Sequence, residues 1–147
     1  MPPMLKDLPD HHDADLVIKL YDLRRDPVMR DSRAAIGAEF WPRTADEAVA
    51  VLAHDHPLNA AYRQTSTYWE MVYGMAHHGI VHADYLMENS GEGLILFSRV
   101  EAYLAAIRQA GSSVAFQHAE WVASETAVGR RLMERFRALV RAAMEGR

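Results

Sequence analysis

The sequence predicts an all-α protein, folded as a single compact bundle of six or seven helices with short connections. Good helix formers dominate, namely alanine, leucine, methionine, glutamate and arginine, whereas valine and isoleucine do not form the alternating runs of strands. Half of the 147 residues are hydrophobic, which is ordinary for one globular domain. We expect residues 1–10, which contain three of the six prolines, to form an irregular arm. Residues 11–147 are then expected to form a single helical domain.

Start and stop signals place the first helices. A stripe of leucines predicts a first helix over about residues 13–25. Asp26 is a suitable N-cap and Pro27 a suitable first helical residue, so a second helix follows and ends before Trp41-Pro42. Thr44 has the spacing of a capping box with the glutamate three residues later, which predicts a short third helix.

The longest predicted helix runs from Pro57 to His78. Its apolar positions form an arc wide enough for neighbours on more than one side, which indicates a central helix. Gly79 follows directly and favours the left-handed conformation that ends helices. This helix is the best candidate for the centre of the core.

The remaining helices are shorter or less clearly bounded. We expect a single turn over 84–88, a helix over 92–110 that ends at Gly111, and a helix with Phe116 and Trp121 that Ser112 or Ser113 could cap. Polar residues and a glycine after position 123 leave open whether the last segment, to about residue 144, continues this helix or starts a new one. That last segment is clearly amphipathic.

Three short stretches carry a resemblance to known proteins. They are DPVMRDSRA after the first helix, GIVHADYL after the aromatic-rich helix, and LAAIR at the end of the next long helix. In this order they resemble uncharacterised bacterial all-helical proteins known only as a domain of unknown function. The similarity covers about residues 13–110 and implies an all-α fold without a known activity. The basic C-terminal helix lies outside it.

Composition excludes several classes of protein. The chain has no cysteine, so disulfides, thiolate metal sites and cysteine nucleophiles are excluded. No apolar run approaches the ~20 residues of a membrane span. The N-terminus also lacks the apolar run of a signal peptide. We therefore expect a cytoplasmic protein, and no motif predicts a cofactor.

Positive charge gathers near the C-terminus. Residues 126–147 carry six arginines and two acids, whereas residues 1–125 have a net charge of −8. A basic amphipathic helix can bind an anionic polymer or lipid through Arg130, Arg131, Arg135, Arg137 and Arg141. The same arginines can instead complement the helix dipole and solvate the outer face, which is the interpretation we favour. Nucleic acid is therefore not an expected partner.

The eight histidines raise the question of a metal site. The stretch MAHHGIVHAD places His78 and His82 four residues apart, but Gly79 between them ends the helix on which that spacing would count. No H-E-x-x-H motif occurs. A metal-dependent enzyme or sensor would then need ligands from distant segments, such as His54, His56, His82 and Asp84.

The function that the sequence favours is a small, non-enzymatic module that acts through protein contacts with a partner or with itself, and a homodimer is the expected form. No catalytic residue is predicted, because nucleophile motifs and glycine-rich phosphate loops are absent from the sequence. Tryptophan, tyrosine and methionine are plentiful and are enriched at interfaces. Trp41 and Trp121 are the predicted contact residues. The metal-dependent protein and the binder of anionic polymers or lipids remain alternatives.

Overall fold

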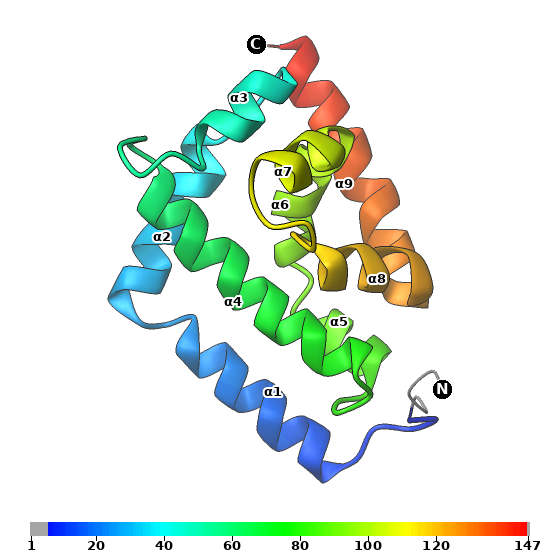
Figure 1. The fold of residues 1–147 in the computed structure, drawn as a ribbon. Helices are drawn as coiled ribbons and strands as arrows, with labels where there is room; N and C mark the ends of the chain where they lie inside the picture. Colours follow the sequence, from blue (N-terminus) through cyan, green and yellow to red (C-terminus); the bar gives the residue numbers. More distant parts are fainter. Residues whose placement is uncertain (1–5, 147) are drawn as a thin grey trace.

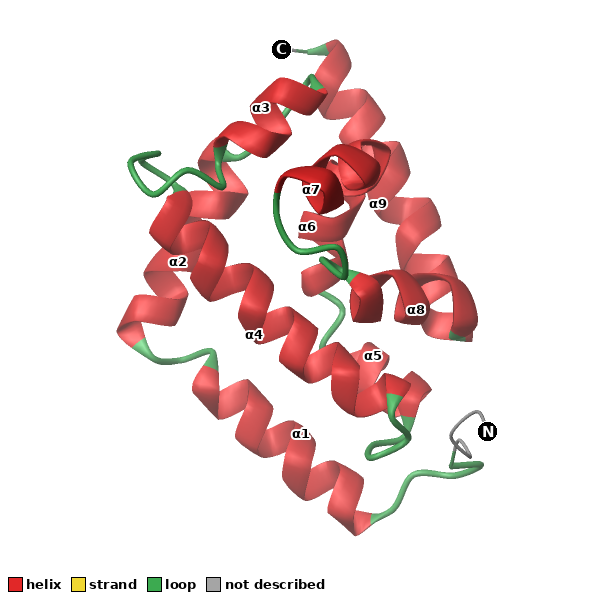
Figure 2. Cartoon of the chain, viewed as in Figure 1, coloured by secondary structure: helices red, strands yellow, loops and turns green. Residues whose placement is uncertain are grey.

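Helices joined by short loops make up residues 6–146, the part of the chain that the computed structural model describes (Figure 2), and no strand occurs among them. The all-α class is confirmed. The helices are α1 (His11–Leu23), α2 (Pro27–Glu39), α3 (Ala45–Ala50), α4 (Asn59–His77), α5 (Ala83–Asn89), α6 (Gly93–Val100), α7 (Leu104–Ala110), α8 (Gln117–Glu125) and α9 (Ala127–Glu145), with a 3₁₀ turn η1 (Glu101–Tyr103) between α6 and α7.

Two expected segments are divided in the structure. The helix expected over 92–110 is interrupted by η1, so it forms α6 and α7. The open question about the last segment is answered by Thr126, whose hydroxyl donates to the Val122 carbonyl and accepts the Gly129 N–H. Because that side chain ends one helix and caps the next, α8 and α9 are separate. These divisions raise the number of helices above the expected six or seven.

Local capping explains where the first helices begin. Asp10 and Asp13 form a reciprocal capping box, so α1 begins at His11, two residues earlier than expected. Asp26 accepts the first free N–H groups of α2 and Pro27 is its first residue, as the sequence predicts. The expected arm over 1–10 falls partly outside the described residues. Within it, Lys6 donates to the Asp13 carboxylate at 3.0 Å.

The central helix α4 ends where the sequence predicts. Gly79 has φ 74°, and the N–H groups of Ile80 and Val81 turn back onto the Met75 carbonyl. Only glycine adopts this φ without steric cost, so the helix cannot continue toward His82. The next helix, α5, therefore starts in a new direction.

The start of α8 differs from the expectation. Ser112 and Ser113 do not cap it, because the residue at its N-cap is Phe116, which has φ 61°. The first N–H groups of α8 are instead bound by Glu70 of α4, whose carboxylate oxygens accept from His118 at 3.1 Å and from Ala119 at 2.8 Å. A distant carboxylate thus does the work of a local cap and joins α4 to α8.

The apolar interior surrounds α6, which contacts α4 on one side, α8 on another and α9 behind (Figure 1). Buried apolar side chains form one cluster that draws on every one of the nine α-helices found within residues 6–146. The largest side chains that are fully buried are those of Tyr73, Leu86, Met87, Leu94, Ile107, Met133, Val51, Val72, Val81, Val100, Val122 and Asp13. No helix within residues 6–146 combines the length and the apolar character needed to cross a membrane.

Polar contacts fasten α1 to the rest of the fold. Buried Asp13 accepts the backbone N–H of His82 at 3.0 Å, while Tyr68 donates to the Leu20 carbonyl at 2.5 Å and Arg24 to the Asn89 carbonyl at 3.3 Å. Buried hydrogen bonds of this kind are costly to break, because each leaves a polar group without water. They fix α1 against α4 and against both ends of α5.

Candidate functional site

An open groove runs beside the corner between α1 and α2. We call it the corner groove, and its volume is about 600 Å³. Three apolar side chains that line it are about half exposed, namely Leu23 (52%), Val28 (58%) and Met71 (44%). The lining also includes Asp26, Met29, Gln64, Thr67 and Tyr68. Several exposed apolar side chains around one groove are typical of a surface that another molecule covers.

The groove has a fixed floor. Met29 and Tyr68 are almost fully buried beneath it, and the Tyr68 hydroxyl is bonded to α1. Asp26 caps α2 and so holds the turn that places Leu23 and Val28 on either side of the corner. The apolar side chains are therefore presented by rigid helices, which lowers the entropy lost when a partner binds.

A smaller recess of about 220 Å³ lies at the same corner. We call it the arginine recess, because Tyr21 and four arginines line it: Arg24, Arg25, Arg30 and Arg33. The Arg33 guanidinium donates two hydrogen bonds, of 2.6 and 2.7 Å, to the Glu92 carboxylate. These hydrogen bonds raise the pKa of Arg33, and burial opposes them only in part. Arg25 and Arg30 are exposed and make no ion pair within residues 6–146.

Arg24 gives the recess its buried charge. Only 9% of this residue is exposed, and its guanidinium lies 4.5 Å from the Tyr21 ring centre and 5.4 Å from that of Trp69. Its Nε is buried without a hydrogen-bond partner among the described residues. A buried guanidinium that lacks a carboxylate partner favours a nearby anion. The corner therefore offers apolar contact and positive charge side by side.

The two predicted contact tryptophans are both partly buried and packed against a side chain. The Arg99 guanidinium lies 3.5 Å from the ring centre of Trp41 and also donates to three carbonyls at the end of α2. Trp121 is stacked on His77 with 4.6 Å between ring centres. Each indole thus has one face covered from within the chain.

Of the five arginines predicted to form a basic face on α9, two make hydrogen bonds to other groups of the described chain. Arg137 makes two hydrogen bonds of 2.9 Å to Glu101, and Arg130 donates to the Ser124 carbonyl. Arg131, Arg135 and Arg141 are exposed and make no ion pair within the described part of the chain. All five predicted arginines are therefore exposed, and three of them keep their charge unpaired within these residues.

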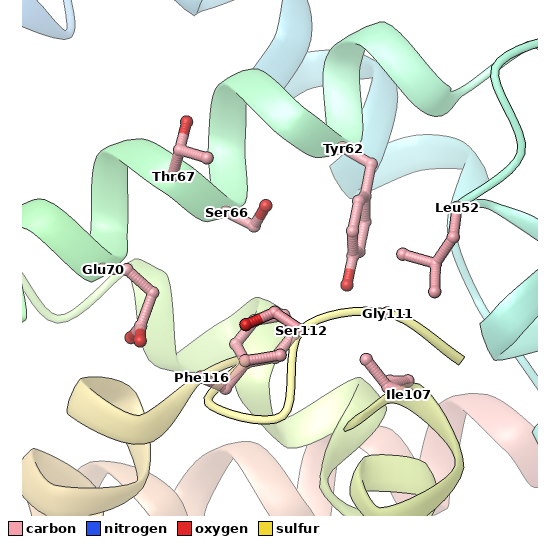
Figure 3. A pocket seen from close by; sticks show the side chains of 10 residues that line it. Leu52, Tyr62, Ser66, Thr67, Glu70, Ile107, Gly111, Ser112 and Phe116 are labelled. Atoms are coloured by element: carbon pink, nitrogen blue, oxygen red, sulfur yellow. The ribbon is translucent and has the colours of Figure 1, made fainter. Parts of the chain in front are cut away.

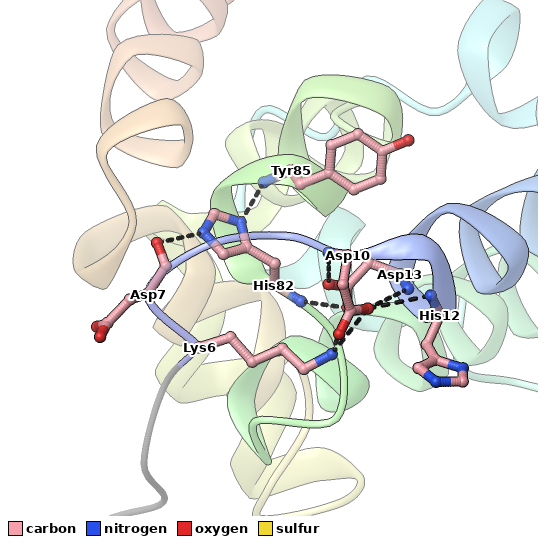
Figure 4. Close-up of polar contacts among 7 residues, drawn as sticks. All are labelled: Lys6, Asp7, Asp10, His12, Asp13, His82 and Tyr85. Atoms are coloured by element: carbon pink, nitrogen blue, oxygen red, sulfur yellow. Dashed lines mark hydrogen bonds and ion pairs between the residues drawn. The ribbon is translucent and has the colours of Figure 1, made fainter.

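The four predicted metal ligands do not come together. His54 and His56 precede α4, whereas His82 and Asp84 follow it, and a helix of 19 residues is about 28 Å long. His82 uses Nδ1 to accept the Tyr85 N–H (Figure 4). Asp84 accepts the Val128 N–H at the start of α9. Across residues 6–146, no group of three or more histidines and acids is arranged to hold a metal ion.

Two other histidines do meet, although the sequence places them 41 residues apart. Nδ1 of His77 lies 2.9 Å from Nδ1 of His118, beside Trp121. Burial lowers the pKa of both imidazoles, and the neighbouring histidines lower it further. Burial likewise raises the pKa of nearby Glu70, although its bonds to the start of α8 oppose this. The pair joins α4 to α8.

Sequence reasoning missed the arginine recess. Its arginines lie on both sides of Asp26-Pro27, and the segment DPVMRDSRA was noted only for its resemblance. A usable signal was present, because Asp26-Pro27 predicts a tight corner that brings the end of one helix beside the start of the next. The arginines of the tail stand out in the sequence because few acids accompany them, whereas Asp22, Asp26 and Asp31 stand among the arginines of the recess.

These features define a class: an all-α domain with an apolar groove and a basic recess at one corner, and with no cluster of metal ligands among the described residues. The model of a family described as "domain of unknown function (DUF4760)" matches residues 9–126, and the chain belongs to that family. Comparison with curated proteins and with solved structures finds no match. The resemblance inferred from the sequence is thereby confirmed at the level of an uncharacterised domain.

Proposed function

We propose that this protein is a non-enzymatic interaction module whose corner groove binds an amphipathic helical segment of a partner protein. The observation that carries the proposal is the exposure of Leu23, Val28 and Met71 around one groove. An amphipathic helix lays apolar side chains into such a groove at one-turn intervals. The contact would remove these three side chains from water.

Charge indicates what the partner segment carries at one end. Arg25 and Arg30 are exposed beside the groove, and Arg24 is buried near them with an unpartnered Nε. Carboxylates on the partner would form charge-assisted hydrogen bonds with these guanidinium groups. We therefore assign to the groove a helix with an apolar stripe and an acidic end.

Self-association is the competing interpretation. The sequence favours a homodimer, and a second copy could present one of its own helices to the groove. We favour a foreign helix because the acidic end that the recess requires accounts for its charge directly. A protein that stays monomeric in sedimentation at high concentration, yet binds an acidic amphipathic peptide, fits this proposal. A dimer that Val28→Ser dissociates would contradict it.

A displayed library of helical peptides tests the groove without a known partner. We expect the selected peptides to share an apolar stripe and acidic residues at one end. Leu23→Ser or Val28→Ser should weaken the best peptide about tenfold, as hot-spot substitutions do. Arg25→Glu should weaken it most at low salt, because charge attraction between exposed groups is screened.

The matched control is Val114→Ser. Val114 is 52% exposed but does not line the groove, so its substitution should leave peptide affinity unchanged. All these side chains are exposed, so the fold should tolerate each change. Selected peptides that bind the groove variants as tightly as the parent protein would overturn the proposal.

A further inference from the structure

A second cavity lies between α4, α7 and the loop over 111–116, and its lining shares only Thr67 with that of the corner groove. Its volume is about 230 Å³ (Figure 3). The apolar part of its lining is formed by Leu52, Ile107, Ala115 and Phe116. Its polar groups come mainly from successive turns of α4 and from the loop, namely Tyr62, Ser66, Glu70 and Ser112. A mainly apolar cavity with a few converging polar groups is the usual form of a small-molecule site.

Tyr62 gives this cavity a specific donor. The residue is 4% exposed, yet its hydroxyl points into the cavity and makes no hydrogen bond within residues 6–146. The hydroxyl of Tyr62 is therefore available to donate to a molecule in the cavity. Its ring is fixed by edge contacts with Phe40 at 5.6 Å and with Phe116 at 6.3 Å. The donor is therefore rigid, and nothing in the described chain uses it.

The wall opposite α4 is held in an unfavourable backbone conformation. Among the described residues, Phe116 is the one non-glycine with positive φ, at 61°. This conformation is costly for a bulky side chain and persists only where the surroundings impose it. Here it turns the loop so that the Phe116 ring is buried against Tyr62. Tyr62 on α4 and Phe116 on the facing loop are thus both held in place at the cavity.

We infer that this cavity binds a small, neutral, mainly apolar molecule whose one oxygen accepts a hydrogen bond from Tyr62. We call it the Tyr62 cavity. An apolar cavity of about 150 Å³ holds benzene, so about 230 Å³ suits a molecule with roughly nine non-hydrogen atoms. The Glu70 carboxylate at the far end repels anions. Burial raises the pKa of Tyr62 well above the ordinary value of a tyrosine, so the phenol keeps its proton and remains a hydrogen-bond donor.

Three matched probes test the inference by protein NMR. Acetophenone has the required size and a carbonyl acceptor, ethylbenzene lacks the acceptor, and benzoate is an anion of similar size. We expect acetophenone to shift the backbone signals of Ser66, Ser112 and Ala115, ethylbenzene to do so more weakly, and benzoate to leave them unchanged.

Tyr62→Phe isolates the hydrogen bond. This variant keeps the ring, so ethylbenzene should bind as before, whereas acetophenone should bind about five- to tenfold more weakly. Thermal unfolding should show no loss of stability, because the hydroxyl has no protein partner to lose. Ser66→Leu should fill the cavity and abolish the response to both neutral probes.

Two results would overturn the inference. One is acetophenone binding that Tyr62→Phe does not change. The other is a set of shifted signals that lies away from the cavity or survives Ser66→Leu. Neither result bears on the corner groove, which the peptide selection tests by itself.

Discussion

The contact between His77 and His118 depends on a proton. Two Nδ1 atoms 2.9 Å apart form a hydrogen bond only if one nitrogen carries hydrogen and the other presents a lone pair. If both rings become cationic, the donors face each other and the bond is lost. Both pKa values are already lowered, first by burial and then by neighbouring histidines, although Glu70 raises that of His77.

The protein should therefore lose stability in mild acid. Because the folded-state pKa values lie below the ordinary 6.5, the unfolded chain binds more protons between them and 6.5. The contribution is complete above about pH 7 and is lost as pH falls through 6.5 toward the folded-state values. We expect the thermal midpoint to fall between about pH 7.5 and pH 5.5. The fall should be smaller in His118→Gln, by circular dichroism.

His54→Gln is the control for this measurement. His54 is exposed in the turn before α4 and should leave the pH dependence unchanged. Equal pH dependence in the parent protein and in His118→Gln would contradict the argument.

These histidines also show the limit of sequence reasoning for single residues. Gly79 was identified as the end of α4, and its φ confirms that. The sequence places His77 and His78 at the end of the longest predicted helix, but nothing in it pairs them with His118. Their meeting follows from the way in which α8 packs on α4, and no local pattern encodes it. The Glu70 cap of α8 was missed for the same reason, since 48 residues separate donor and acceptor.

Among the helices, two glycines should respond to substitution in opposite ways. Gly37 lies within α2, and a methyl group there would meet no atom within 4 Å. Gly37→Ala should therefore stabilise the protein by about 0.5–1 kcal/mol, because alanine is the better helix former. Gly79→Ala should destabilise it by about 1–2 kcal/mol, because alanine resists φ 74°. Urea unfolding measures both changes.

Each variant serves as the control for the other. If both substitutions shifted the unfolding midpoint in the same direction, the assigned backbone conformations would be wrong. The comparison also separates what sequence predicts well from what it predicts poorly. Caps at Asp26 and Gly79 depend on nearby residues and were predicted. The break at η1 lies in a run of helix-forming residues, so no residue type there signals it.

In the molecule as a whole, α9 extends the fold beyond the family match. That match ends at residue 126, where α9 is about to begin. The helix nevertheless packs on α5, α6 and α8, and Met133 on it is completely buried. It therefore completes the core rather than forming an appendage. The sequence showed that α9 is amphipathic, but not which helices its apolar face covers.

Substitutions at a buried and at an exposed position of α9 should then change the free energy of unfolding by different amounts. Met133→Ala should lower the free energy of unfolding by about 2–4 kcal/mol, because it leaves a cavity in the core. Leu139→Ala, less than two turns further along, should change it by less than about 0.5 kcal/mol, because Leu139 is 56% exposed. Urea unfolding of both variants, monitored by circular dichroism, measures the two changes in the free energy of unfolding. Small effects at both positions would mean that α9 is dispensable and that α1 to α8 fold without it.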